Sequence, residues 1–154
     1  MANNKLHRIR GDTRYAIRNT RYAICYLRMN ITKKKFEELV HDIAAQVVES
    51  LPPDLRADAV NVILNVADKP SPDQLDEGEG GDDLLGLYEG VPLVERHPDD
   101  VILEPDHITL FRIALMEMCE SEDELREEIR ATIIHELGHY FGFDEDDLEK
   151  RGWG

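Results

Sequence analysis

The sequence predicts an α+β fold, in which a short mixed sheet packs on helices within one small domain. Apolar residues recur at helical spacing after Thr32, alternate at strand spacing after Val60, and return to helical spacing in the last third of the chain. This order of elements is typical of an α+β domain. The 154 residues suit a single domain, and their 42% hydrophobic content allows a modest core. That core should be largely aliphatic, because only 6% of the residues are aromatic.

The first 28 residues differ in charge from the rest of the chain. They carry seven basic residues and one acidic residue, whereas the remainder carries 11 basic and 32 acidic residues. Thr13–Ile17 recurs as Thr20–Ile24, but two copies are too few for a coiled coil. We expect residues 1–28 to be a basic, disordered extension and residues 29–154 to be the folded domain, starting at Met29. The alternative is a basic arm that binds an acidic partner, including the body of this protein.

The first predicted helix follows Thr32, whose side chain can cap it. Its apolar positions fall on one helical face, and they are Phe36, Leu39, Val40, Ile43, Val47 and Val48. Pro52 and Pro53 are expected to end this helix, because proline lacks the amide that a helix interior needs.

Short strands are predicted next. Val60–Val66 alternates between apolar and polar positions, which indicates a strand with one buried face. Leu84–Glu89 also reads as a strand, in which Gly86 marks a bulge or a close approach of backbones. Val101–Leu103 and Ile108–Phe111 are two further candidates, separated by a Pro-Asp pair. We predict a loop at Lys69–Asp83 and a helix at Ile113–Cys119.

The last helix is the most clearly marked. Ser121 and Glu124 form a capping box, in which each side chain satisfies a backbone donor of the first turn. The helix is expected to run to Tyr140, and Gly142 can adopt the left-handed conformation that ends a helix.

Inside this helix lies an HExxH motif, with histidines at His135 and His139. Residues four apart in a helix lie on the same face, so that both imidazoles can reach one metal ion. Glu136 is offset by one residue, which places its carboxylate where it can act as general base on metal-activated water. Zinc suits this site, because two imidazoles, one oxygen ligand and one open position make its usual catalytic geometry.

The third ligand is expected just after the motif. Fifteen residues follow His139 in this sequence, which leaves no room for a ligand on a distant later helix. The segment that ends in Gly142 resembles the metzincin arrangement HExxHxxGxxH, and the position of its last histidine is Glu145 here. Asp144 and Asp146 are alternative ligands. This acidic run is otherwise interpreted as a solvated cap on a last helical turn at Leu148–Lys150.

Three separated segments resemble the small bacterial zincin-like metallopeptidases, also called minimal zincins, over Phe36 to about Leu148. These segments are Leu84–Leu93, Pro105–Phe111 and Thr132–Gly142. The resemblance implies a single zincin-like α+β domain, with the HExxH helix near the C-terminus and a carboxylate after the glycine turn (HExxHxxGxx[DE]).

The predicted function is therefore that of an endopeptidase-like zinc metallopeptidase, with Glu136 as general base and His135, His139 and Glu145 as ligands of Zn²⁺. By analogy with zincins, Leu84–Glu89 is an edge strand that pairs with a peptide substrate, although a packed internal strand is also possible. Tyr88 and Tyr140 are interpreted either as donors to the oxyanion or as structural residues. The alternative function is a zinc-stabilised binding or regulatory module without physiological proteolysis.

Composition indicates the partners and the compartment. The net charge of −15 argues against nucleic acid and against an anionic membrane surface as partners. The sequence contains no run of eighteen apolar residues, so we expect no membrane span. Two distant cysteines, Cys25 and Cys119, without a CxxC pair favour free thiols in a reducing compartment. We therefore expect a cytoplasmic monomer that acts on a peptide or protein substrate.

Overall fold

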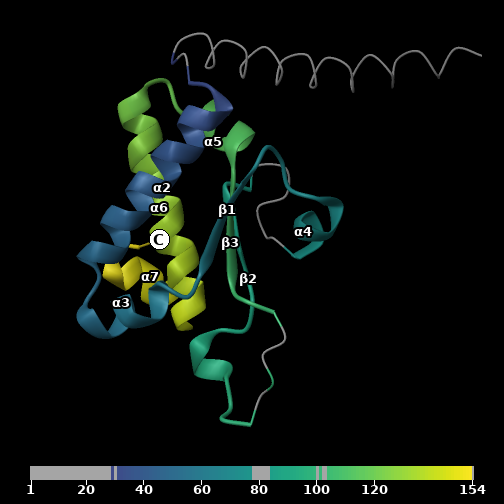
Figure 1. Ribbon diagram of the computed structural model, residues 1–154, viewed down its shortest axis with the longest axis vertical. Helices are drawn as coiled ribbons and strands as arrows, with labels where there is room; N and C mark the ends of the chain where they lie inside the picture. Colours follow the sequence, from purple (N-terminus) through teal and green to yellow (C-terminus); the bar gives the residue numbers. More distant parts are fainter. Residues whose placement is uncertain (1–28, 30, 78–83, 100, 102–103, 154) are drawn as a thin grey trace, which may run out of the picture.

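The fold is α+β, as predicted. The computed structural model describes residues 29, 31–77, 84–99, 101 and 104–153, and these contain one mixed sheet of three strands in the order β1–β3–β2 (Figure 1). Strand β1 (Ile63–Ala67) is parallel to β3 (His107–Phe111), and β2 (Gly86–Glu89) is antiparallel to β3. In this part of the chain β3 is the central strand, and β2 is an edge strand.

Two long helices build the core beside the sheet. Helix α6 (Glu122–Phe141) packs on β2 and β3, and α2 (Lys33–Ser50) packs on α6 (Figure 1). Helix α5 (Arg112–Met118) connects β3 with α6. The buried apolar residues of α2 and α6 meet Ile108 and Leu110 of β3 in one cluster, and they are Phe36, Leu39, Val40, Ile43, Val47, Leu125, Ile129, Ile133, Leu137, Tyr140 and Phe141.

The predicted ends of both long helices are confirmed. The Thr32 hydroxyl accepts a hydrogen bond from the Lys35 amide at 3.1 Å, and the Ser121 hydroxyl accepts one from the Glu124 amide at 3.2 Å. The carboxylate of Glu124 accepts a hydrogen bond from the amide of Glu120. In an ideal capping box it would accept from the amide of the N-cap residue, Ser121. Gly142 ends α6 with a φ of 86°, the left-handed conformation that glycine adopts without strain.

Two short helices differ from the expectations. Pro53 begins a new helix, α3 (Pro53–Ala59), because the first helical position needs no amide. Helix α4 (Pro72–Glu77) lies in the segment predicted as a loop. Its signal was a second capping box, in which the Ser71 and Gln74 side chains each accept the other residue's backbone amide.

Strands β1 and β2 begin later than predicted, at Ile63 and Gly86, whereas β3 begins one residue earlier, at His107. Val60 lies in the turn after α3 and is 66% exposed, while Leu64 and Val66 of β1 pack against the core. Val101 is in no strand, and residues 102–103 lie outside the described residues. The basic segment 1–28 lies outside them too, so the boundary at residue 28 stays a prediction. None of the described helices combines the length and apolar character that a bilayer span needs.

Candidate metal centre

The two motif histidines project from the same side of α6, one turn apart. Their side chains are partly exposed, at 30% for His135 and 34% for His139. Ile133 and Leu137, on the opposite side of the helix, are buried in the core. The hydrophobic face that anchors α6 therefore fixes the direction of both imidazoles.

The chain reverses after α6 and begins a second helix, α7 (Glu145–Arg151). The reversal is a hydrogen-bonded turn, in which the amides of Gly142 and Phe143 donate to His139 and Gly138 at 3.0 Å each. The Asp144 carboxylate then caps α7 by accepting from the Asp147 amide at 2.8 Å. The turn and the cap together place Glu145 at the first position of α7.

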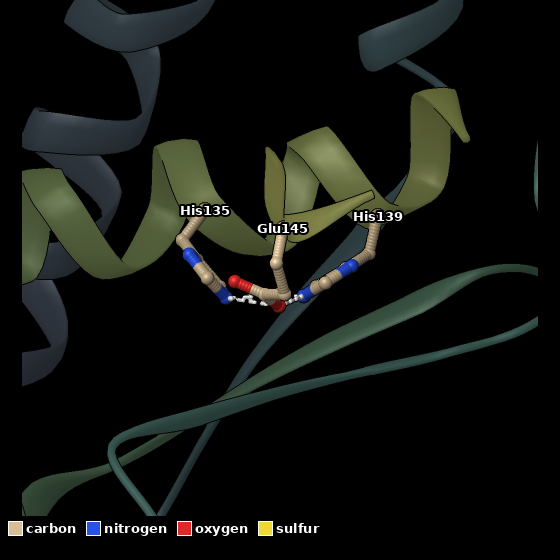
Figure 2. Close-up of side chains that lie close together, drawn as sticks. All are labelled: His135, His139 and Glu145. Atoms are coloured by element: carbon tan, nitrogen blue, oxygen red, sulfur yellow. Dashed lines mark hydrogen bonds and ion pairs between the residues drawn. The ribbon is translucent and has the colours of Figure 1, made fainter. Parts of the chain in front are cut away.

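The carboxylate of Glu145 meets the two imidazoles (Figure 2). Its Oε1 atom lies 3.6 Å from Nε2 of His135 and 3.4 Å from Nε2 of His139, and the two nitrogens are 3.0 Å apart. Ligand atoms at zinc's usual bond lengths of about 2.0–2.1 Å are separated by about 3.3 Å in a tetrahedral site. The observed separations bracket this value, so the three side chains fit a zinc ion.

Neither of the two alternative ligands belongs to this group of three side chains. Asp144 is used as the cap of α7, and Asp146 is not part of the group. In the described ranges, His135, His139 and Glu145 are the one group of three such side chains within metal-binding distance. Asp144 thus caps a helix, as one interpretation of the acidic run predicted, while its neighbour Glu145 faces the histidines and its role as a ligand stays a prediction.

Gly138 lets α7 approach this closely. A Cβ atom on Gly138 would lie 2.2 Å from Cδ2 of Leu148, the fully buried residue of α7. Gly138, the glycine inside the HExxH motif, is thus the point where α6 and α7 contact each other. This role was not predicted from the sequence, because Gly138 and Leu148 meet only where α7 packs against α6.

Replacing Gly138 with alanine tests this packing. Alanine favours a helix by about 1 kcal/mol over glycine, whereas overpacking a filled contact costs about 1–3 kcal/mol. We expect the clash to prevail, so that Gly138→Ala lowers stability in urea and weakens zinc affinity by about tenfold, as loss of a ligand's support does.

Adding Leu148→Ala to the Gly138→Ala variant removes the atoms that the new methyl group meets. The effects of the two substitutions on stability should therefore be strongly non-additive. Higher stability with unchanged zinc affinity in Gly138→Ala would show that close helix packing does not position Glu145.

Glu136 points to the sheet, away from the solvent-exposed side of the centre. It is 7% exposed, and its Oε2 accepts a hydrogen bond from the Tyr88 amide of β2 at 2.8 Å. A Cβ on Gly86 would lie 2.6 Å from Thr132 and 3.3 Å from Glu136, which confirms the predicted close backbone approach. Burial raises the pKa of Glu136 to about 6, against the lowering effects of His135 and the Tyr88 amide.

Strand β2 is fixed by a buried polar network that was not predicted from the sequence. Asp106 accepts hydrogen bonds from the Tyr88 hydroxyl at 2.7 Å and from the Arg96 guanidinium at 2.6 Å. The Tyr140 hydroxyl donates to the carbonyl of Asp58 at 3.1 Å. Burial raises the pKa of both phenols. Because both hydroxyls are bonded within the packing, these tyrosines have structural roles.

An HExxH helix whose histidines meet a carboxylate from the next helix, on an α+β domain, is the arrangement of a metallopeptidase-type centre. Residues 59–153 match the zincin-like metallopeptidase family, and the chain belongs to this family. The match includes all three strands and both helices of the centre. Membership implies a metal cofactor, usually zinc. The comparison with curated proteins found no match.

Proposed function

We propose that this protein is a zinc-dependent peptidase, with His135, His139 and Glu145 as metal ligands and Glu136 as general base. The main support is the meeting of three ligand atoms at the spacing of a tetrahedral zinc site. Three ligands leave one position for water or substrate, as in catalytic rather than structural zinc sites. When bound, zinc would supply the Lewis acidity that activates water and polarises the carbonyl of the peptide bond.

Glu136 is the proton carrier in this proposal. The Tyr88 amide holds Oε2 of its carboxylate, which fixes the orientation of the group beside the histidines. The carboxylate takes a proton from the attacking water and transfers it to the nitrogen of the leaving amine. Burial between α6 and β2 limits the other conformations that this side chain could adopt.

The substrate chain would lie along β2. The Phe111 amide donates to the Leu85 carbonyl, so the alternation of an antiparallel pair turns the backbone groups of Leu87 and Glu89 toward β3 as well. Gly86 and Tyr88 then present theirs away from the sheet, on the side where Tyr88 meets Glu136. An extended peptide could add to this edge through its main chain.

Digestion of a mixture of unstructured peptides by the zinc-loaded protein tests the proposal. We expect cleavage at discrete bonds, detected by mass spectrometry, and loss of cleavage after zinc is removed with a chelator. If the protein binds zinc firmly but cleaves none of the peptides, the peptidase proposal fails and the zinc-stabilised binding module replaces it.

A further inference from the structure

The segment that follows β2, residues 90–96, displays apolar side chains to solvent. Val91 is 49% exposed and Val94 is 71% exposed, whereas Leu93 between them packs against the core. Val94 belongs to the short helix η2 (Leu93–Glu95). Exposed apolar residues close to a candidate active centre are candidates for a binding surface.

The 90–96 segment is held in a fixed conformation. The Arg96 guanidinium donates to the carbonyl of Val91 at 2.8 Å and to both carboxylate oxygens of Asp106 at 2.6 Å. At the other end, a Cβ on Gly90 would lie 2.3 Å from Asp106, so this backbone rests directly on the same buried carboxylate. The valines are thus exposed on a tied-down segment, and binding there would cost little ordering of the loop.

This segment adjoins the metal centre. Val94 contacts the turn at Gly142, where a Cβ would lie 2.2 Å from its Cγ2 atom. Gly142 is midway in sequence between the ligand candidates His139 and Glu145. In Figure 1 the segment continues below β2, beside the lower end of α6, which it contacts. A peptide that lies along β2 past Glu136 therefore reaches Val91 and Val94 next.

We propose that the 90–96 segment binds an apolar side chain of the substrate and so determines specificity. This inference rests on the proposed peptidase function. The surface offers little to a negatively charged group, because the Arg96 guanidinium is neutralised by Asp106 and the other charged residue of the segment, Glu95, is an exposed carboxylate. An aliphatic or aromatic side chain would bury apolar area against the exposed Val94, which contacts the turn at Gly142.

The direction of the substrate follows from pairing geometry. Antiparallel addition to β2 is the more stable arrangement, and it places the amino-terminal part of the peptide at the end of β2. Glu136 lies beside Gly86 and Tyr88, before the 90–96 segment along the strand. The apolar residue should therefore lie on the amino side of the cleaved bond, within a few residues of it.

Sequencing the products of a randomised peptide library, cleaved by the zinc-loaded wild-type protein, tests this assignment. We expect enrichment of Leu, Ile, Val, Phe or Met on the amino side of the cleavage site. For one preferred peptide, Val94→Asp should raise KM about tenfold and leave kcat within about twofold, because ground-state binding is lost. Val94→Leu should retain the wild-type KM.

The matched control is Met118→Asp, which places the same charge at a residue of similar exposure (61%) on α5, at the opposite end of α6 from η2. In the Glu136→Gln background, Val94→Asp should weaken binding of the uncleaved peptide about tenfold. Cleavage without an apolar preference, a preference on the carboxyl side alone, or equal effects of Val94→Asp and Met118→Asp would overturn the inference and leave the peptidase function intact. No cleavage by the zinc-loaded protein would overturn both.

Discussion

Replacing Glu136 with glutamine is expected to abolish peptide hydrolysis while zinc stays bound. The amide has nearly the shape of the carboxylate and can still accept from the Tyr88 amide through its oxygen. It cannot take a proton from water, so the contribution of general base catalysis is lost. That contribution is typically about 10²–10⁴-fold in rate, and we expect kcat to decrease by a factor in this range.

The measurement is the rate of cleavage of one peptide, with the zinc content of each sample determined in parallel. Glu127→Gln is a matched control, because Glu127 is an exposed residue on the same helix. Its activity should equal that of the wild type. Turnover by Glu136→Gln at more than a tenth of the wild-type rate, with equal zinc, would remove Glu136 from the mechanism.

Replacing His139 with alanine is expected to remove both the metal and the activity. The change deletes the nitrogen that lies 3.0 Å from His135 Nε2 and 3.4 Å from Glu145 Oε1, so two of the three proposed ligands would remain. Changing a residue that only supports a ligand costs about 10–100-fold in metal affinity. Deleting the ligand itself should exceed a hundredfold, and hydrolysis should fall to background at micromolar zinc.

Competition with a chromogenic chelator measures this loss of affinity. The control is His41→Ala, since His41 is exposed on α2 and belongs to no candidate metal group in the described part of the chain. Zinc should also stabilise the wild type against urea, by about 2.7 kcal/mol at a free concentration of 100 Kd. His139→Ala should show little of this stabilisation, and an undiminished effect would place the metal elsewhere.

Local sequence signals predicted the elements whose ends or faces depend on near neighbours. Thr32, Ser121 and Gly142 mark helix ends through bonds within a few residues, so their roles were readable without the fold. The spacing of His135 and His139 fixed their common face in the same way. Helix α4 was missed although it is also local, because the acidic composition of its segment masked the capping box at Ser71.

Contacts between distant residues could not be predicted. The pairing of Arg96 with Asp106, the support of Glu136 by Tyr88, and the packing of Gly138 against Leu148 each depend on how elements meet in space. Glu145 was identified by analogy with the glycine turn, but its neighbours Asp144 and Asp146 carry the same chemistry. Only the start of α7 determines which carboxylate faces the histidines.

The central claim is that His135, His139 and Glu145 hold a zinc ion, and the zinc content of the purified protein tests it most directly. Elemental analysis after saturation and desalting should give about one zinc per chain for the wild type. Glu145→Ala deletes a proposed ligand and should weaken binding by more than about a hundredfold, while Asp146→Ala, which changes the next residue of the same helix, should bind like the wild type. Absence of zinc from the wild type, or equal loss in the two variants, would contradict the assignment of this site.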